Sequence, residues 1–268
     1  MRRAALLAVL ALGPVLVGPG RSAGAADAPP SFGPHEYRHG DFALRGYLAR
    51  PAGDPATKRP GVLVVHDWLG CGPFAHERAK ELAGAGYVAL ALDMYGAGKL
   101  ASEPKEASAL AKAFYDDPAL MVARAKAGLD ELLAQPGVDP ERVVAIGFCF
   151  GGAVALHLAR SGERMTGVVS FHGGLKTTTP ARPGVVGAKI LVLHGGADPF
   201  VPTKDVAAFM DEMNAAKAIW RMEIYGGAVH SFTNREAGSD PSKGAAFDAD
   251  AERRSRAAQN AFFTEVFR

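Results

Sequence analysis

Short apolar runs rich in β-branched residues alternate along the chain with stretches of helical spacing. Five runs are apolar almost throughout and cover residues 62–65, 88–92, 143–146, 166–171 and 190–193. A run without polar alternation is typical of a strand buried on both faces, as in a parallel sheet. A sixth strand is expected over residues 219–225, and residues 37–48 read as an early hairpin or edge strand.

Helices are expected between these strands. Asp117-Pro118 predicts a cap and a first helical turn, and Val122, Ala125 and Leu129 continue the helical spacing until the breakers at residues 135–137. A last helix is expected to begin at about Asp250. Alternation of strand and helix predicts an α/β fold, with a doubly wound, mostly parallel sheet flanked by helices. Ligands then bind at the carboxyl ends of the strands.

The first 25 residues have the layout of a secretory signal peptide. Arg2 and Arg3 precede an apolar run over residues 4–17, and small residues at 23–25 form an Ala-x-Ala cleavage site. The run is shorter than a comfortable transmembrane helix, although an uncleaved anchor is the alternative. We therefore expect residues 26–268 to form one exported domain, periplasmic or secreted, without a membrane partner after cleavage.

Composition supports an ordinary globular protein. Of 268 residues, 48% are hydrophobic and 22% are charged, which argues against disorder. The formal net charge is +2 and no long basic run occurs, so a nucleic-acid partner is not indicated.

The most specific motif is Gly147-Phe148-Cys149-Phe150-Gly151-Gly152. A predicted strand precedes it and a predicted helix over residues 152–160 follows it, which is the context of a nucleophile elbow with Cys in place of Ser. The backbone approaches closely on both sides of such a turn, and Gly147 and Gly151 leave room because they lack a Cβ atom. The positive end of the following helix favours the thiolate. Cys149 is the candidate nucleophile.

Two further candidates follow the last strands. Asp198 lies just after residues 190–193, and His230 lies just after residues 219–225. The order nucleophile, acid, histidine is that of the α/β-hydrolase fold. His230 is then the general base and Asp198 fixes its tautomer. The loop after residues 62–65 supplies one oxyanion-hole N–H in this fold and the residue after the nucleophile supplies the other, which nominates the backbone amides of Trp68 and Phe150.

Other interpretations stay open. A non-catalytic ligand-binding protein that kept the fold is one alternative. A metal enzyme is another, because His66, His172, His194 and His230 all follow strands, but no spacing typical of zinc ligands occurs. We expect neither metal nor cofactor. Two cysteines in an exported chain also make a Cys71–Cys149 disulfide an alternative, and this disulfide would block the nucleophile.

The chain resembles the dienelactone hydrolase family. The resemblance rests on the motif at residues 147–152 and on the segments at residues 64–70, 91–96, 194–199 and 230–232. It implies a Cys149–His230–Asp198 triad that opens small esters or lactones through an acyl-cysteine.

Three departures from the family pattern bear on specificity. Asp67 stands where the family usually has a Glu that influences the resting thiol. Ala97 and Asn234 stand where the family has arginines that hold a substrate carboxylate, which leaves Lys99 and Arg235 nearby as candidate substrate-binding residues. A less anionic ester or lactone is therefore expected.

Overall fold

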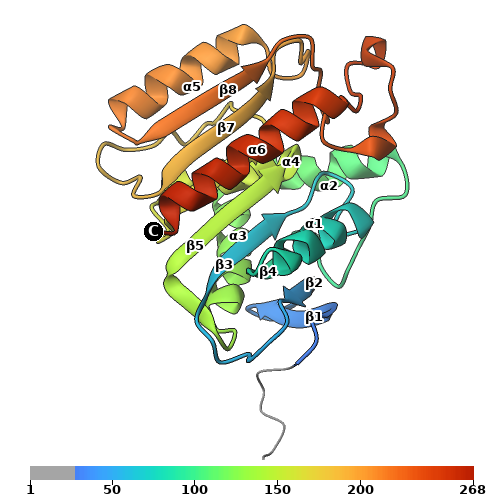
Figure 1. The fold of residues 1–268 in the computed structure, drawn as a ribbon. Coiled ribbons are helices and arrows are strands. Elements are labelled where there is room, and N and C mark those ends of the chain that lie inside the picture. Colours follow the sequence, from blue (N-terminus) through green and yellow to red (C-terminus); the bar gives the residue numbers. More distant parts are fainter. Residues whose placement is uncertain (1–27) are drawn as a thin grey trace, which may run out of the picture.

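The computed structural model describes residues 28–268, which form an eight-stranded sheet with helices on both faces (Figure 1). The predicted signal peptide lies outside the described residues. The elements in chain order are β1 (Ser31–His39), β2 (Phe42–Arg50), β3 (Arg59–Val65), α1 (Pro73–Gly84), β4 (Val88–Leu92), α2 (Pro104–Asp116), α3 (Pro118–Leu133), β5 (Val138–Phe148), α4 (Phe150–Ser161), β6 (Gly167–Phe171), β7 (Lys189–Gly195), α5 (Thr203–Ala215), β8 (Trp220–Tyr225), two single 3-10 turns, η2 (Arg235–Ala237) and η3 (Pro241–Lys243), and α6 (Ala249–Val266).

The strand order is β1-β2-β4-β3-β5-β6-β7-β8. β1 and β2 form an antiparallel hairpin, β2 pairs antiparallel with β4, and all other pairs are parallel. The parallel strands therefore end at one edge of the sheet, where ligands bind in open α/β folds. The expected α/β-hydrolase fold is confirmed, including the early hairpin.

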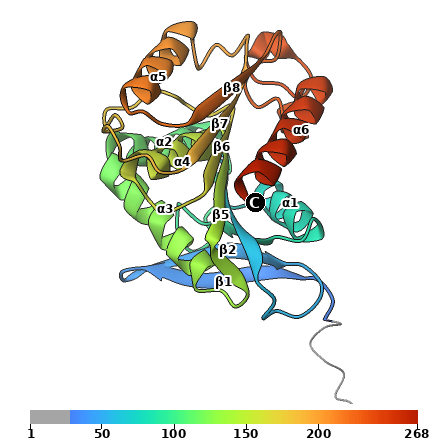
Figure 2. The ribbon, with the colours of Figure 1, turned by 60° about the vertical axis from the view of Figure 1, so that its left-hand side comes forward.

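Two apolar cores enclose the sheet because successive strand side chains point to opposite faces. On β3, Leu63 and Val65 belong to one core, while Val62 and Val64 belong to the other. The first core also holds residues of α2, α3, α4 and α5, and the second holds residues of α1 and α6. Figure 2 shows the same division, with α1 and α6 together on one side of the sheet.

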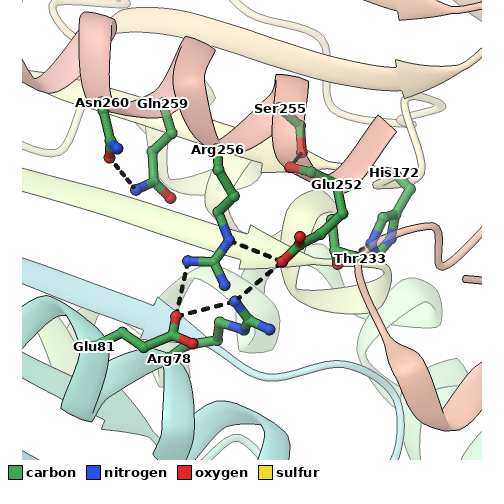
Figure 3. A network of polar contacts seen from close by, with 9 residues as sticks. All are labelled: Arg78, Glu81, His172, Thr233, Glu252, Ser255, Arg256, Gln259 and Asn260. Atoms are coloured by element: carbon green, nitrogen blue, oxygen red, sulfur yellow. Dashed lines mark hydrogen bonds and ion pairs between the residues drawn. The ribbon is translucent and has the colours of Figure 1, made fainter. Parts of the chain in front are cut away.

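An ion-pair network joins α1 to α6 (Figure 3). The Arg256 guanidinium lies 2.8 Å from Glu81 and 3.4 Å from Glu252, and Arg78 lies 3.0 Å from Glu81. Two cations thus alternate with two carboxylates across the helix pair. The network fixes the C-terminal helix next to the first helix, beside the segment that carries His230.

Local signals explain the element boundaries. The Asp117 carboxylate accepts a hydrogen bond from the Leu120 amide, so α3 starts where the cap was expected. α6 begins after Asp248, whose carboxylate accepts from two amides of the first turn. α4 begins at Phe150, two residues earlier than the glycines suggested, because the strand turns directly into the helix at Cys149. Within residues 28–268, no helix is long and apolar enough to cross a membrane.

Candidate active site

Three loops at the carboxyl ends of the strands bring Cys149, His230 and Asp198 together. Cys149 follows β5, Asp198 follows β7 and His230 follows β8. The Cys149 Sγ atom lies 3.0 Å from His230 Nε2, and His230 Nδ1 lies 2.7 Å from Asp198 Oδ2. These distances are those of a nucleophile, a base and a carboxylate that orients the base.

The turn at Cys149 holds the sulfur away from the sheet at the start of α4. Its backbone has φ 54° and ψ −115°, a strained conformation for a residue with a side chain. A Cβ atom at Gly147 would lie 1.9 Å from the Gly151 carbonyl oxygen, and one at Gly151 would lie 2.3 Å from the Val65 carbonyl oxygen. The glycines are therefore required by the close backbone approach, as the sequence indicated.

The His230 imidazole is surrounded by negative groups. Burial lowers its pKa, but the Cys149 sulfur and the Asp198 carboxylate outweigh this and raise it to about 10. The other Asp198 oxygen accepts hydrogen bonds from the Phe200 and Val201 amides, which fixes the carboxylate. The arrangement favours an imidazolium beside the sulfur at neutral pH.

A second histidine supports the backbone of the turn. His172 Nδ1 lies 3.1 Å from the Cys149 amide, which donates to it, and His172 Nε2 lies 2.9 Å from the Thr233 hydroxyl (Figure 3). Burial lowers the pKa of His172 well below its ordinary value, so the ring is neutral. Because Nδ1 accepts, Nε2 carries the proton and donates to Thr233. His172 thus connects the Cys149 turn to the loop that carries His230.

Two backbone amides lie beside the sulfur. Trp68, Cys149 and Phe150 line one small cavity next to α2. Within residues 28–268, neither the Trp68 nor the Phe150 amide donates to a protein acceptor. The Tyr95 hydroxyl donates to the Trp68 carbonyl at 2.9 Å and holds this loop in place. Both amide N–H groups are therefore available as donors beside this cavity.

The Cys149–His230 pair opens into a cavity of about 560 Å3. Its walls are largely apolar, with Trp68, Leu69, Tyr115, Phe200 and Val201 among the lining residues. Asp67 and Glu236 are the carboxylates of the lining, and no Lys or Arg of the described chain lines it. Such a cavity suits a small, mostly uncharged ligand.

Asp67 lies at the cavity wall and is almost fully buried. Burial raises the pKa of its carboxyl to about 6, the Glu236 charge adds to the effect, and the Leu69 amide and His230 oppose it. Asp67 Oδ1 accepts from the Leu69 amide at 2.8 Å. The hydrogen-bond partner of the Cys149 sulfur is His230, whereas the Asp67 carboxylate accepts from the backbone of its own loop.

The candidate substrate-binding cations lie elsewhere. Lys99 pairs with Glu106 at 3.2 Å, and the Arg235 guanidinium stacks over the Phe247 ring at 4.5 Å. Neither residue lines the 560 Å3 cavity. The structure therefore does not bring Lys99 or Arg235 to the Cys149–His230 pair.

The remaining alternatives from the sequence can be compared with the geometry. Cys71 and Cys149 are both free thiols, and the Cys71 Sγ atom donates to the Ala91 carbonyl. Burial raises the pKa of Cys71, which makes it a poor nucleophile. Across residues 28–268, no three His, Cys, Asp or Glu side chains form a group that could hold a metal ion, so the four histidines do not converge.

The fold and this site define an α/β-hydrolase that acts on esters or lactones. The dienelactone hydrolase family model matches residues 44–267, and the chain belongs to that family. A protein of Aquifex aeolicus named "Putative carboxymethylenebutenolidase" is 28% identical over 220 residues, which cover 78% of this chain and 90% of that protein.

Two solved structures are similar over nearly the whole described chain. One, named m3DLH, is 38% identical with a TM-score of 0.84 and covers 91% of this chain and 100% of its own. The other is a dienelactone hydrolase-like promiscuous phosphotriesterase, P91, from metagenomic libraries. It is 39% identical with a TM-score of 0.82 and covers 90% of this chain and 100% of its own.

Sequence reasoning missed three residues that shape the site. The sequence indicates His172 only as a possible metal ligand, although its position after the strand next to that of Cys149 is a usable signal. Tyr115 lies at the end of α2 and Glu236 lies in η2, and both line the cavity. No local motif marks either residue, because only the fold brings these segments to the sheet edge.

Proposed function

We propose that the protein hydrolyses small carboxylic esters or lactones through an acyl-cysteine on Cys149. The observation that carries the proposal is the continuous Cys149–His230–Asp198 contact inside an apolar cavity. The non-catalytic binder is the less favoured reading, because a binder has no use for a nucleophile, a base and free oxyanion donors arranged around one point.

In the first half of the reaction, the Cys149 sulfur attacks the carbonyl carbon. The carbonyl oxygen becomes an oxyanion that accepts from the Trp68 and Phe150 amides. When the intermediate collapses, the bond to the alkoxy oxygen breaks and the leaving alkoxide takes a proton from His230. The acyl group stays on sulfur as a thioester, and Asp198 holds the imidazole in position throughout.

In the second half, neutral His230 takes a proton from water and the hydroxide attacks the thioester. The oxyanion returns to the same two amides. Collapse breaks the carbon–sulfur bond, releases the carboxylic acid and restores Cys149 beside protonated His230. For a lactone, the alkoxy group remains attached to the acyl chain, so the product is one hydroxy acid.

The charges around the sulfur favour an uncharged acyl group. The two carboxyl side chains of the cavity, Asp67 and Glu236, would repel a substrate carboxylate placed against the wall. Lys99 and Arg235 lie outside the lining and offer no compensation there. We expect neutral esters to be hydrolysed faster than esters whose negative charge lies next to the reacting carbonyl.

The test is hydrolysis of 4-nitrophenyl acetate by wild-type protein, Cys149→Ala and Cys149→Ser. Wild type is expected to turn over, and mass spectrometry of a rapidly quenched reaction is expected to find one acetyl group on the Cys149 peptide. Cys149→Ala should fall to the rate of buffer. Equal turnover by wild type and Cys149→Ala would refute the mechanism, and binding without turnover by wild type would favour the binder.

Neutral phosphotriesters are a second candidate substrate class. The P91 relative is named a promiscuous phosphotriesterase, and the cavity here offers a nucleophile and, within the described residues, no lining Lys or Arg. Attack of Cys149 on phosphorus would expel 4-nitrophenolate from paraoxon, and water activated by His230 would release the phosphate diester. More than one equivalent of 4-nitrophenolate per protein supports turnover, whereas a single equivalent indicates a stable phosphoryl-cysteine.

We also propose that residues 1–25 direct export and are removed. The supporting observation is the sequence pattern of a basic start, an apolar run and an Ala-x-Ala site. A fusion of residues 1–30 to alkaline phosphatase, expressed in a Gram-negative bacterium, is expected to be active, and the mature protein should begin at Ala26. An inactive fusion would refute the proposal.

A further inference from the structure

A second cavity of about 400 Å3 adjoins the first. The two cavities share four lining residues, Tyr115, Gly174, Phe200 and Val201. The first cavity holds Cys149 and His230, whereas the second extends toward α4, the start of α5 and the segment at residues 175–178. A substrate bound at Cys149 would pass Tyr115 to reach this separate compartment.

The second cavity is rich in hydrogen-bond donors. Lys176, Thr177, Thr178 and His157 line it. Among the described residues, Lys176 has no carboxylate within 4.0 Å, so its ammonium group is not neutralised by an ion pair. This contrasts with the first cavity, whose charged side chains other than His230 are carboxylates.

His157 adds a neutral imidazole that forms no hydrogen bond with the described residues to the lining of this compartment. It is 4% exposed, lies on α4 and lines the cavity. No hydrogen bond to its ring nitrogens is formed within residues 28–268. Burial lowers the pKa of His157 to about 4, helped by Arg160 and opposed by Glu212, so the ring is neutral near pH 7. Because His157 lines the cavity, its N–H is available to donate to a bound acceptor.

From these contacts we infer that the second cavity is a subsite for a carboxylate at the far end of the substrate. Lys176 supplies the charge, and His157, Thr177 and Thr178 supply neutral donors. The inference rests on the proposed ester hydrolysis, because it places the carboxylate on a chain whose reacting carbonyl lies at Cys149. The sequence suggested Lys99 or Arg235 as the cation that binds the substrate. In this proposal Lys176 is that cation, and it lies in the second cavity rather than beside the Cys149 sulfur.

Substitution of Asp205 should change the binding of a carboxylate in the direction opposite to substitution of Lys176. Asp205 lies in the first turn of α5 and lines the same cavity, so its charge weakens the attraction for an anion. Asp205→Asn should therefore improve carboxylated substrates, while Lys176→Met should weaken them. Lys204→Met is the matched control, because Lys204 is exposed on the same turn and does not line the cavity.

Gly174 allows the passage to be closed. A Cβ atom there would lie 3.6 Å from the Tyr115 hydroxyl and 3.8 Å from the Ala153 Cβ atom, both ordinary contacts. Gly174→Ala should therefore be tolerated by the fold. The larger side chain of Gly174→Leu would project between the shared walls and separate the two cavities.

The experiment compares 4-nitrophenyl alkanoates with 4-nitrophenyl monoesters of dicarboxylic acids of equal carbon number, from four to eight carbons. In wild type, kcat/KM for the carboxylated ester relative to its neutral partner should rise with length, once the carboxylate passes Tyr115. Lys176→Met should lower that ratio by about fivefold at the optimal length, the size expected for a partly exposed charge pair. Asp205→Asn should raise it, Lys204→Met should not move it, and Gly174→Leu should abolish the length dependence.

The ratio separates this inference from the proposed function. If all variants hydrolyse the neutral esters through Cys149 but Lys176→Met and Lys204→Met shift the ratio alike, the subsite is refuted while the hydrolase remains. If Gly174→Leu misfolds, competition supplies a second measurement: free adipate should inhibit wild type more strongly than Lys176→Met, and salt should weaken this difference. Equal inhibition of the two proteins would overturn the subsite.

Discussion

Asp67→Asn is expected to stabilise the protein at alkaline pH. The Asp67 carboxyl has a pKa of about 6 in the folded protein, against an ordinary value of 3.8, chiefly because it is buried. Above both values the carboxyl is ionised in the folded and unfolded states, and the folded state bears the cost of the buried charge. Asparagine keeps the acceptor for the Leu69 amide and carries no charge.

The magnitude follows from the two pKa values. One pKa unit corresponds to about 1.4 kcal/mol, so the cost of ionised Asp67 reaches about 3 kcal/mol above pH 6. Between pH 6 and 3.8 the unfolded chain is ionised and the folded chain is largely protonated, and the cost decreases. At pH 5 about 1.6 kcal/mol remains, and near pH 3.8 almost none does. Because the amide is itself desolvated, these values are upper limits.

Urea unfolding of wild type and Asp67→Asn at pH 8, 5 and 4 measures the effect. The free energy of unfolding of the variant should exceed that of wild type at pH 8, and the gain should shrink steadily toward pH 4. Asp211→Asn is the control, because Asp211 is exposed on α5, away from Asp67, and its substitution should change stability little. A gain in the free energy of unfolding that is independent of pH, or a lower free energy of unfolding at pH 8, would refute the raised pKa of the buried Asp67 carboxyl.

Three further predictions concern the residues around the nucleophile. Gly147→Ala should destabilise the protein by at least about 3 kcal/mol in urea unfolding, because its Cβ atom would overlap the Gly151 carbonyl; Gly84→Ala, which meets no atom within 4 Å, should be nearly neutral. His172→Ala should lower kcat/KM by about tenfold or more while the protein stays folded. His172→Asn, whose side-chain oxygen can still accept from the Cys149 amide, should recover part of this activity. Equal activity of wild type and His172→Ala would contradict a role of His172 in positioning the Cys149 turn. Asp198→Asn should lower kcat/KM by about 10³ to 10⁴. With an alkyl ester, whose leaving group takes a proton from His230, the alkaline limb of the pH–rate profile should move from about pH 10 to lower pH. An unchanged alkaline limb would show that another group sets it.

The sheet and the turn at Cys149 could be predicted because their signals are local. Continuous apolar runs identify strands buried on both faces, and Gly147 and Gly151 identify a turn that excludes side chains. The order of Cys149, Asp198 and His230 then restricts the topology, since each follows a strand that ends at the same edge. In the structure, Cys149 Sγ lies 3.0 Å from His230 Nε2, and His230 Nδ1 lies 2.7 Å from Asp198 Oδ2.

The substrate side of the site could not be predicted in the same way. Lys99 and Arg235 are close in sequence to the positions of the family arginines. In the structure, however, Lys99 forms an ion pair with Glu106, and the Arg235 guanidinium stacks over the Phe247 ring. Lys176 follows β6 and carries no motif. It lines the second cavity because the segment after β6 contacts α4, where Arg160 donates to the Leu175 carbonyl. Side-chain pairing in the folded chain decides which cation remains available, and the sequence pattern does not reveal this pairing.

Two buried histidines connect the loops on which catalysis depends. His66 Nδ1 donates to the Asp67 carbonyl and its Nε2 accepts from the Met94 amide, while His172 Nδ1 accepts from the Cys149 amide and its Nε2 donates to Thr233. Each ring needs one protonated and one unprotonated nitrogen for this task. Burial lowers the pKa of His66 to about 4 and that of His172 well below its ordinary value, so both rings remain neutral where His230 is charged. One residue type thus serves two purposes, and the difference lies in the Cys149 sulfur and the Asp198 carboxylate, both of which His230 contacts and His66 and His172 do not.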